Sequence, residues 1–174
     1  MTQRAVQLLL LSVFLDALAW MAVAAEPKIA NFENDAIKKE LEKLEGTWTI
    51  VSRETKATKT PDEDLKEMQL TIKGNQWTMT HSRGSDKATM KIDPTKDPKT
   101  IDLVFSSLGA MGSTFKLPVG RKIVSRGIYK LEYKQGEGYI LTLCRVDEQR
   151  ATRPKKFKTT ESSGLLFVFK RKSE

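Results

Sequence analysis

The sequence is short of the residues that most often build catalytic and metal sites. Cysteine and histidine occur once each among its 174 residues, as Cys144 and His81. A single cysteine excludes an internal disulfide, so the core has to stabilise the fold without a covalent link. A single histidine with no neighbouring cysteine excludes an ordinary zinc site. We therefore expect no metal ion and no cofactor.

The residues that remain form no recognisable catalytic arrangement. A nucleophilic cysteine needs a base and an accessible, electropositive setting, whereas Cys144 lies in an apolar strand pattern, opposite in parity to Leu141 and Leu143. His81 shares the parity of Trp77 and Met79, which indicates a residue near a turn at the mouth of a barrel. We expect no catalytic residues and no enzyme, although catalysis by carboxylates alone stays open.

Other cofactor motifs are missing as well. Asp93, Asp97 and Asp102 cluster around two prolines without the spacing of an EF-hand loop. Aspartate before proline is typical of turns. Gly109, Gly112 and Gly120 fit neither a P-loop nor a dinucleotide-binding spacing.

Long apolar runs are limited to the N-terminus. Positive charge at Met1 to Arg4, an almost wholly apolar stretch and the small residues Val23-Ala24-Ala25 predict a signal peptide over residues 1–25. A retained membrane anchor is the alternative, because the run approaches the ~20 residues of a marginal span. No cysteine lies there to accept a lipid. We expect a linker over 26–36, a domain over 37–174, and a secreted, periplasmic or cell-envelope location.

Charge is unbalanced: 30 Lys and Arg residues face 22 Asp and Glu residues, for a formal net charge of +8. For an exported protein this favours anionic envelope polymers or lipid head groups over nucleic acid as partners. The basic residues concentrate near Pro154 and Phe157. The candidate anion-binding residues there are Arg150, Arg153, Lys155, Lys156 and Lys158, and a solvated loop is the alternative interpretation.

A short amphipathic helix precedes the domain. Asn34 and Asp35 are suitable N-caps, Ile37, Leu41 and Leu44 form one narrow apolar stripe, and Gly46 ends the helix. The narrow stripe predicts a helix that covers the end or edge of another structure.

From Trp48 onward, apolar and polar residues alternate with the period of a β-strand. The pattern predicts about eight strands joined mostly by short turns, which favours antiparallel pairing. Such strands form an up-and-down barrel or a sandwich. We favour the barrel because a single open sheet would leave two edges exposed. The segment from Ser106 to Ile123 is too long for a simple turn and predicts a folded flap.

Several short motifs occur in an order that resembles one lipocalin-like family, the uncharacterised planctomycete domain family. They cover nearly the whole domain: Leu41–Trp48, Leu70–Gly74, Ile92–Leu103, Gly127–Leu131, Leu141–Arg145, Arg153-Pro154 with Phe157, and Val168–Arg171. The resemblance implies an all-β, lipocalin-like antiparallel up-and-down barrel. It also implies that Gly46 and Trp48 close one end, with Lys170 or Arg171 over the Trp48 ring. It implies no activity.

Two functions follow as expectations. The first is an exported binding module for a small apolar molecule, lined by the predicted inward residues Trp77, Met79, Met90, Phe105, Tyr129, Leu131 and Leu141. Because these side chains are large, a filled barrel is the alternative. The second is a structural or interaction protein of the cell envelope that binds anionic polymer or head groups through its basic loop.

Overall fold

The structure is a computed structural model that describes residues 29–110, 113–118, 123–147, 152–161 and 163–172. The predicted signal peptide lies outside the described residues, and so does Arg150 of the predicted basic loop. The chain divides into two compact units, residues 1–33 and 34–174, and all contacts below are within the second. No described helix is both long and apolar enough to cross a membrane.

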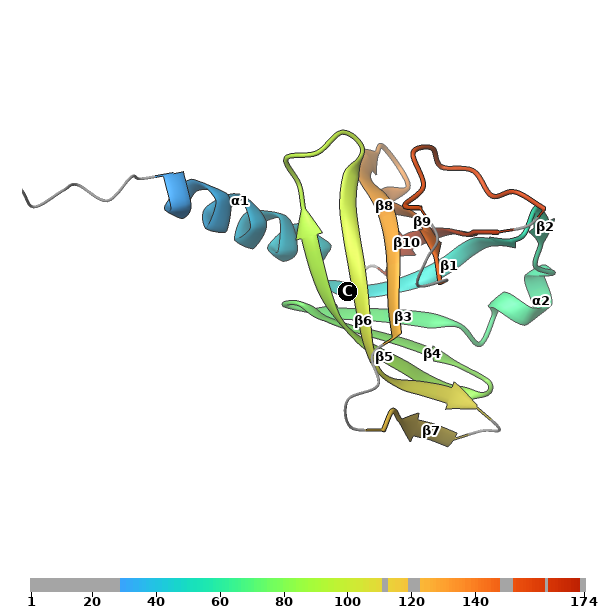
Figure 1. Cartoon of the computed structure of the whole chain (residues 1–174). Helices are drawn as coiled ribbons and strands as arrows, with labels where there is room; N and C mark the ends of the chain where they lie inside the picture. Colours follow the sequence, from blue (N-terminus) through green and yellow to red (C-terminus); the bar gives the residue numbers. More distant parts are fainter. Residues whose placement is uncertain (1–28, 111–112, 119–122, 148–151, 162, 173–174) are drawn as a thin grey trace, which may run out of the picture. The chain divides into compact units, whose positions relative to one another are not determined.

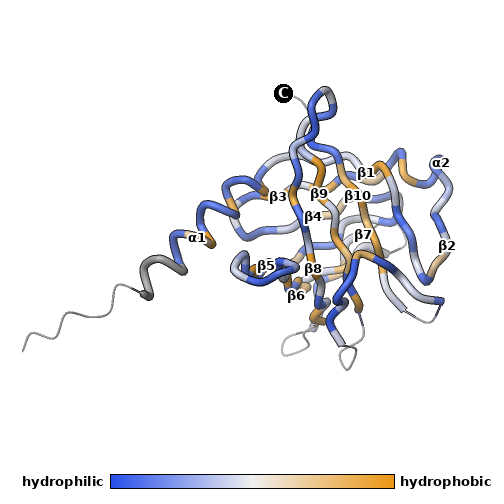
Figure 2. Tube along the Cα trace, turned by 90° about the horizontal axis from the view of Figure 1, so that it is seen from above, coloured by the Kyte–Doolittle hydropathy of each residue, from blue (hydrophilic) through white to orange (hydrophobic). Residues whose placement is uncertain are grey.

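The second unit is an antiparallel β-barrel, as the alternating pattern predicts (Figure 1). Eight strands close the barrel in the described part of the chain: β1 (Gly46–Thr55), β3 (Gln69–Lys73), β4 (Gln76–His81), β5 (Gly84–Asp93), β6 (Lys99–Ala110), β8 (Ile123–Lys134), β9 (Gly138–Val146) and β10 (Leu165–Arg171). Each pairs with its neighbour in chain order, and β10 pairs with β1 to complete the ring. Hydrophobic and hydrophilic residues alternate along these strands (Figure 2).

Three further elements lie outside the barrel wall. The short strand β2 (Thr58–Lys59) pairs with the end of β1, and the one-turn helix α2 (Asp62–Leu65) follows it. The strand β7 (Ser113–Lys116) pairs only with β6 among the described residues. Figure 1 shows β2 and α2 together beside the barrel.

Helix α1 (Ile29–Leu44) covers the barrel with its last turns. It begins at Ile29, inside the predicted linker and before the predicted caps. The predicted stripe is confirmed, because Leu44 is buried and Ile37 and Leu41 pack against the core. The buried carboxylate of Glu40 accepts a hydrogen bond from Lys99 Nζ at 2.6 Å and one from the Tyr129 hydroxyl at 3.3 Å. These polar contacts tie the helix to β6 and β8.

The outer face of β8 and β9 is partly buried, whereas alternation of apolar and polar residues would leave an outer face exposed to solvent. Ile128, Ile140, Cys144 and Val146 are buried there, although they point away from the inward residues of the same strands. The segment 152–161 lies near them: Cys144 Sγ is 3.6 Å from the Lys158 carbonyl oxygen. A second, smaller apolar layer therefore stabilises this side of the barrel from outside.

The segment from Ser106 to Ile123, predicted to be a folded flap, is folded in its described part and takes the form of a β-hairpin. Strand β6 continues to Ala110, and β7 pairs back on it from Ala110↔Ser113 to Ser107↔Lys116. Phe115 of β7 is 54% exposed. The described part of the segment is thus an extension of β6 rather than a separate layer of the fold.

Candidate functional site

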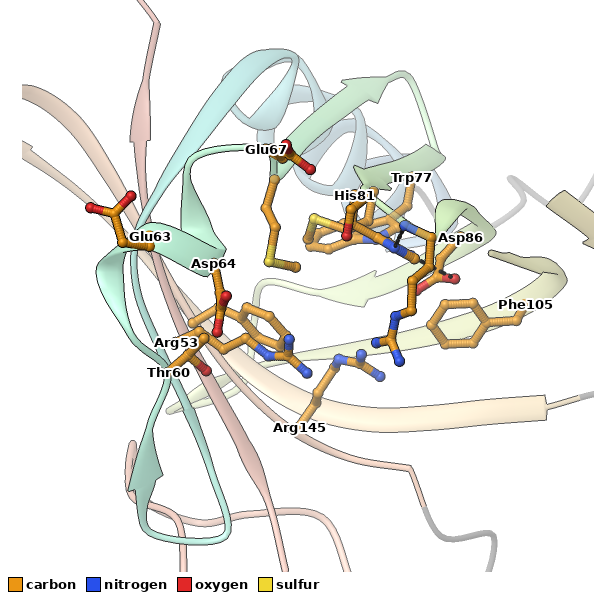
Figure 3. Close-up of a pocket in the computed structure, with 15 residues that line it drawn as sticks. Arg53, Thr60, Glu63, Asp64, Glu67, Trp77, His81, Asp86, Phe105 and Arg145 are labelled. Atoms are coloured by element: carbon orange, nitrogen blue, oxygen red, sulfur yellow. Dashed lines mark hydrogen bonds and ion pairs between the residues drawn. The ribbon is translucent and has the colours of Figure 1, made fainter. Parts of the chain in front are cut away.

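A pocket of about 460 Å³ opens at the end of the barrel away from Trp48 (Figure 3). Strands β1, β4, β5, β6, β9 and β10 contribute to it, together with α2 and the loop after it. This volume lies within the range of roughly 300–1,000 Å³ that is usual for small-molecule sites.

Aromatic and sulfur-containing side chains form the floor of this pocket. Trp77, Met79, Phe105 and Phe167 are each at most 6% exposed and line it from the three strands β4, β6 and β10. Three of them, Trp77, Met79 and Phe105, belong to the predicted ligand-binding set. The structure thus places one part of that set at the open end of the barrel.

The rest of the predicted set lies deeper. Met90, Tyr129 and Leu141 surround a void of about 10 Å³ near Leu44, which has room for about one water molecule. Leu131 is half-buried and packs against the core. The barrel is therefore filled at the end that α1 covers and hollow at the other, with Trp77 touching both spaces.

Arg53 enters the pocket because strand β1 contains a β-bulge. Trp48 and Ile50 point inward, and simple alternation would send Arg53 outward. The pairing with β10 shifts between Ile50↔Phe169 and Ser52↔Val168, so Val51 has no partner and Arg53 faces Phe167. A bulge adds one residue to a strand and reverses the direction of those that follow. Strand alternation alone therefore places Arg53 on the wrong face of β1.

Arg145 enters from β9 by ordinary alternation with Leu141 and Leu143. Its guanidinium carbon lies 5.5 Å from the ring centres of both Phe105 and Phe167. Its Nη1 donates hydrogen bonds to Ser125 Oγ at 2.9 Å and to Asp147 Oδ1. Figure 3 shows the guanidinium groups of Arg53 and Arg145 near each other inside the pocket.

Burial lowers the pKa of both arginines. For Arg53 the loss of water comes first and the positive charge of Arg83 second, while Asp147 and Asp86 oppose them. For Arg145, loss of water again dominates the lowered pKa. Arginine nevertheless stays protonated in proteins. Within the described part of the chain, the Nε atoms of Arg53 and Arg145 are buried and have no hydrogen-bond partner, so donors remain unsatisfied.

His81 lies in the pocket wall, as its parity predicted, but both of its ring nitrogens are engaged. Nδ1 accepts a hydrogen bond from the Arg83 backbone N–H at 3.2 Å, and Nε2 lies 3.5 Å from Asp86 Oδ1. The same Asp86 oxygen accepts a 2.8 Å hydrogen bond from the Gly109 N–H. A Cβ on Gly109 would come within 2.8 Å of the imidazole. In this arrangement His81 has no free nitrogen to act as a base.

The rim of the pocket is acidic on one side. Glu63, Asp64 and Glu67 line it from α2 and the loop after it, and all three are exposed. Glu63 forms an ion pair with Lys66 at 2.8 Å. Figure 3 shows these carboxylates across the pocket from Asp86. The described residues contain no cluster of three or more His, Cys, Asp or Glu side chains that would hold a metal ion.

The described residues of the predicted basic loop have two different environments in the structure. Arg153 is tied to the barrel wall, since it donates to the carbonyl oxygens of Ile101 and Gly127 at 2.9 and 2.7 Å and pairs with Asp102 at 2.7 Å. Lys155, Lys156 and Lys158 are exposed and line a separate hollow of about 320 Å³ beside Pro154.

The predicted closure residues lie together at the covered end. The Arg171 guanidinium carbon is 4.7 Å from the centre of the Trp48 ring, while Trp48 Nε1 donates to the Leu44 carbonyl oxygen at 3.0 Å. Lys170 pairs with Thr49 and Ile140 on the opposite face of β10. Gly46 has φ +125°, a conformation that favours glycine.

The three arginines that line the pocket, Arg53, Arg83 and Arg145, were not among the predicted site residues. The inward direction of Arg145 could have been predicted, because Arg145 shares the parity of Leu141 and Leu143. The inward direction of Arg53 could not, because the alternation of apolar and polar residues does not reveal a bulge. Phe167 of the apolar C-terminal strand also lines the pocket and was not among the predicted ligand-binding residues. Comparison with known proteins found no matching family model, no matching curated protein and no matching solved structure.

Proposed function

We propose that this protein is a binding module that takes up a small molecule with an apolar part at the open end of its barrel. One observation carries the proposal: a pocket of about 460 Å³ has a floor of buried aromatic rings, whereas the other end is filled. The apolar surface of a ligand that leaves water on entering the pocket contributes roughly 25 cal/mol per Å² to binding.

The chemistry of the site favours binding over catalysis. His81 is engaged at both nitrogens, and Cys144 lies on the outer wall under segment 152–161, away from the pocket. The pocket combines an apolar, aromatic floor with a mostly polar lining above it, which suits a small molecule with an apolar part and a polar group.

The test is uptake of a neutral, environment-sensitive dye, N-phenyl-1-naphthylamine, by the full chain. We expect dye emission to rise and the emission of Trp77 at the pocket floor to fall. Thr60→Trp places a bulky side chain at the pocket lining and should reduce uptake. Gln69→Trp, on the exposed outer face of β3, is the matched control and should leave uptake unchanged.

Native mass spectrometry of protein isolated from its own host adds an independent measurement. We expect a bound small molecule in the mass spectrum. Repeated absence of any adduct, together with no dye uptake, would overturn the proposal.

The binding module is proposed to act outside the cytoplasm, after cleavage of residues 1–25, and to belong with the lipocalin-like family that its motifs resemble. The eight-stranded closed barrel and the position of Trp48 under Arg171 support this proposal. Its test is N-terminal sequencing of the protein from its host, where a first residue of Glu26 is expected and an intact Met1 would contradict cleavage.

A second candidate function is attachment to anionic envelope polymer or lipid head groups through the basic loop. The exposed Lys155, Lys156 and Lys158 beside one hollow favour it, and near an anionic membrane each charge is worth about 1 kcal/mol. Retention on an anionic matrix should fall steeply with salt and fall again when all three become Glu. Indifference to both changes would contradict it.

A further inference from the structure

We infer that the ligand of the open pocket is a compact monoanion, such as an aromatic carboxylate, whose charged group is held between Arg53 and Arg145. The inference rests on the proposed function, because it names the chemical class of the molecule bound at the same site. It starts from the hydrogen-bonding and charge balance of these two side chains.

Arg53 has no ion-pair partner in the described part of the chain. Burial and the positive charge of Arg83 lower its pKa, which shows that its surroundings disfavour the charged form. Its guanidinium carbon is 5.7 Å from the Phe167 ring centre, so an aromatic face supports it. A cation taken partly out of water and left unpaired is costly. An anion bound beside it would remove that cost.

Arg145 is only partly satisfied. Its side chain is 13% exposed and pairs with Asp147, which is itself 46% exposed. Phe105 and Phe167 occupy the space around the guanidinium, while Nε has no partner within the described residues. Guanidinium groups bind carboxylates through parallel N–H donors. Because the guanidinium of Arg145 lies over two rings and its Nε has no acceptor, Arg145 can make such a contact with a carboxylate.

Two carboxylates act on these arginines, and both already have partners of their own or pair with one arginine only. Asp86 accepts from the Gly109 N–H and lies beside His81, and Asp147 is paired with Arg145. The charges of Asp86 and Asp147 oppose the lowered pKa of both arginines. Arg53, Arg145 and the exposed Arg83 thus bring three positive charges against these two negative charges, which leaves this part of the pocket positive.

The floor limits the size of the ligand. Below Trp77 the barrel holds a void of only about 10 Å³, so a long chain has no tunnel to enter. Phe105, Phe167 and Trp77 line the space above this void, so a compact ring system can pack on the parts of these side chains that face the pocket.

The rim limits the charge of the ligand. Glu63, Asp64 and Glu67 repel further negative charge at the entrance, so nucleic acid and other polyanions are disfavoured. No ion pair in the described residues joins these carboxylates to Arg53 or Arg145. A ligand with a single negative charge fits both the acidic rim, which repels it less than a polyanion, and the two arginines, which pair with its charged group.

The test compares 1-naphthoate with 1-naphthalenemethanol, which share the ring system and differ in charge, by calorimetric titration of the full chain. A charge-assisted hydrogen bond is typically worth about 1.5–3 kcal/mol, so naphthoate should bind at least about tenfold more tightly. Dodecanoate should bind more weakly than naphthoate, because its chain finds no tunnel.

Arg53→Gln and Arg145→Gln should each lower naphthoate affinity by about tenfold and leave naphthalenemethanol affinity unchanged. Arg126→Gln, on the exposed outer face of β8, removes the same charge outside the pocket and should change neither. If Arg145→Gln does not fold, Arg145→Lys keeps the charge but loses the planar fork and should still weaken naphthoate binding.

The outcomes separate the two proposals. Equal affinity for acid and alcohol overturns the monoanion while the binding module stands, and so does a preference that survives both Arg→Gln variants. Dye uptake without binding of either naphthalene, or tighter binding of dodecanoate, also overturns the compact monoanion. Failure of dye and both naphthalenes to bind overturns the binding module itself.

Discussion

Arg53 lies directly opposite Phe167 on the inner face of the barrel, with its guanidinium carbon 5.7 Å from the centre of the ring. This pairing exists because Val51 is an extra residue in β1. A charged side chain thereby reaches the pocket from a strand whose first half contributes Trp48 and Ile50 to the core.

The bulge gives a prediction about β1 itself. Removing Val51 alone makes the strand regular and still leaves Arg53 inward, so the preference for naphthoate over naphthalenemethanol should persist. Removing Val51 and Ser52 together turns Arg53 outward, and the preference should fall by about tenfold. Calorimetry measures both, and dye uptake reports whether each variant folds. If both deletion variants preferred naphthoate over naphthalenemethanol to the same extent, the number of residues in β1 would not control binding through the direction of Arg53.

A second prediction concerns the covered end of the barrel. Arg171 lies over Trp48, is 4.7 Å from the Tyr139 ring centre and donates to the Lys43 carbonyl oxygen. Arg171→Ala should lower the free energy of unfolding by about 2 kcal/mol, from the cation–π and hydrogen-bond contributions. Lys170→Ala, on the opposite face of β10, should cost less than about 0.5 kcal/mol. Urea unfolding measures both, and equal losses would contradict the assigned roles.

A third prediction concerns high pH. Burial first, and then the charge of Glu40, raises the pKa of Tyr129 above its ordinary value of 10.0. The unfolded chain therefore releases this proton before the folded chain does, and stability is lost as pH rises above about 10. The loss approaches about 1.4 kcal/mol per pH unit from this group.

Tyr129→Phe should remove that part of the pH dependence, as measured by urea unfolding between neutral and strongly alkaline pH. Tyr133→Phe, on the exposed hairpin between β8 and β9, is the matched control and should retain the parent's slope. A Tyr129→Phe protein with the parent's slope would show that this hydroxyl is not the group responsible.

A fourth prediction concerns the single thiol. Cys144 is 0% exposed, and burial raises its pKa. A disulfide reagent such as Ellman's should react on the order of 100-fold more slowly with the folded chain than with the chain in urea, because reaction then requires opening of the structure. Reaction of the folded chain at the unfolded rate would contradict the packing of segment 152–161 on β9.

Alternation was enough to predict the barrel, because inward residues such as Leu70, Met90 and Leu143 recur with period two. It failed where the physical cause is not local. The bulge at Val51 depends on the partner strand, and burial of Ile128 and Cys144 depends on a segment that returns from later in the chain. The pairing of Arg53 with Phe167 has the same kind of cause, because it joins β1 and β10 from opposite ends of the domain sequence.

The pairing of β1 with β10 has a consequence for how the chain reaches its native state. Arg171 contacts the backbone of Lys43, 128 residues earlier, and the Lys172 N–H donates to the Thr47 carbonyl oxygen. Contacts so distant in sequence form late in folding. Until the last strand is available, β1 and β9 each present an open edge that invites association with other chains. Pairing of β10 with β1 thus decides whether the growing polypeptide closes its barrel or keeps two edges that can associate with other chains.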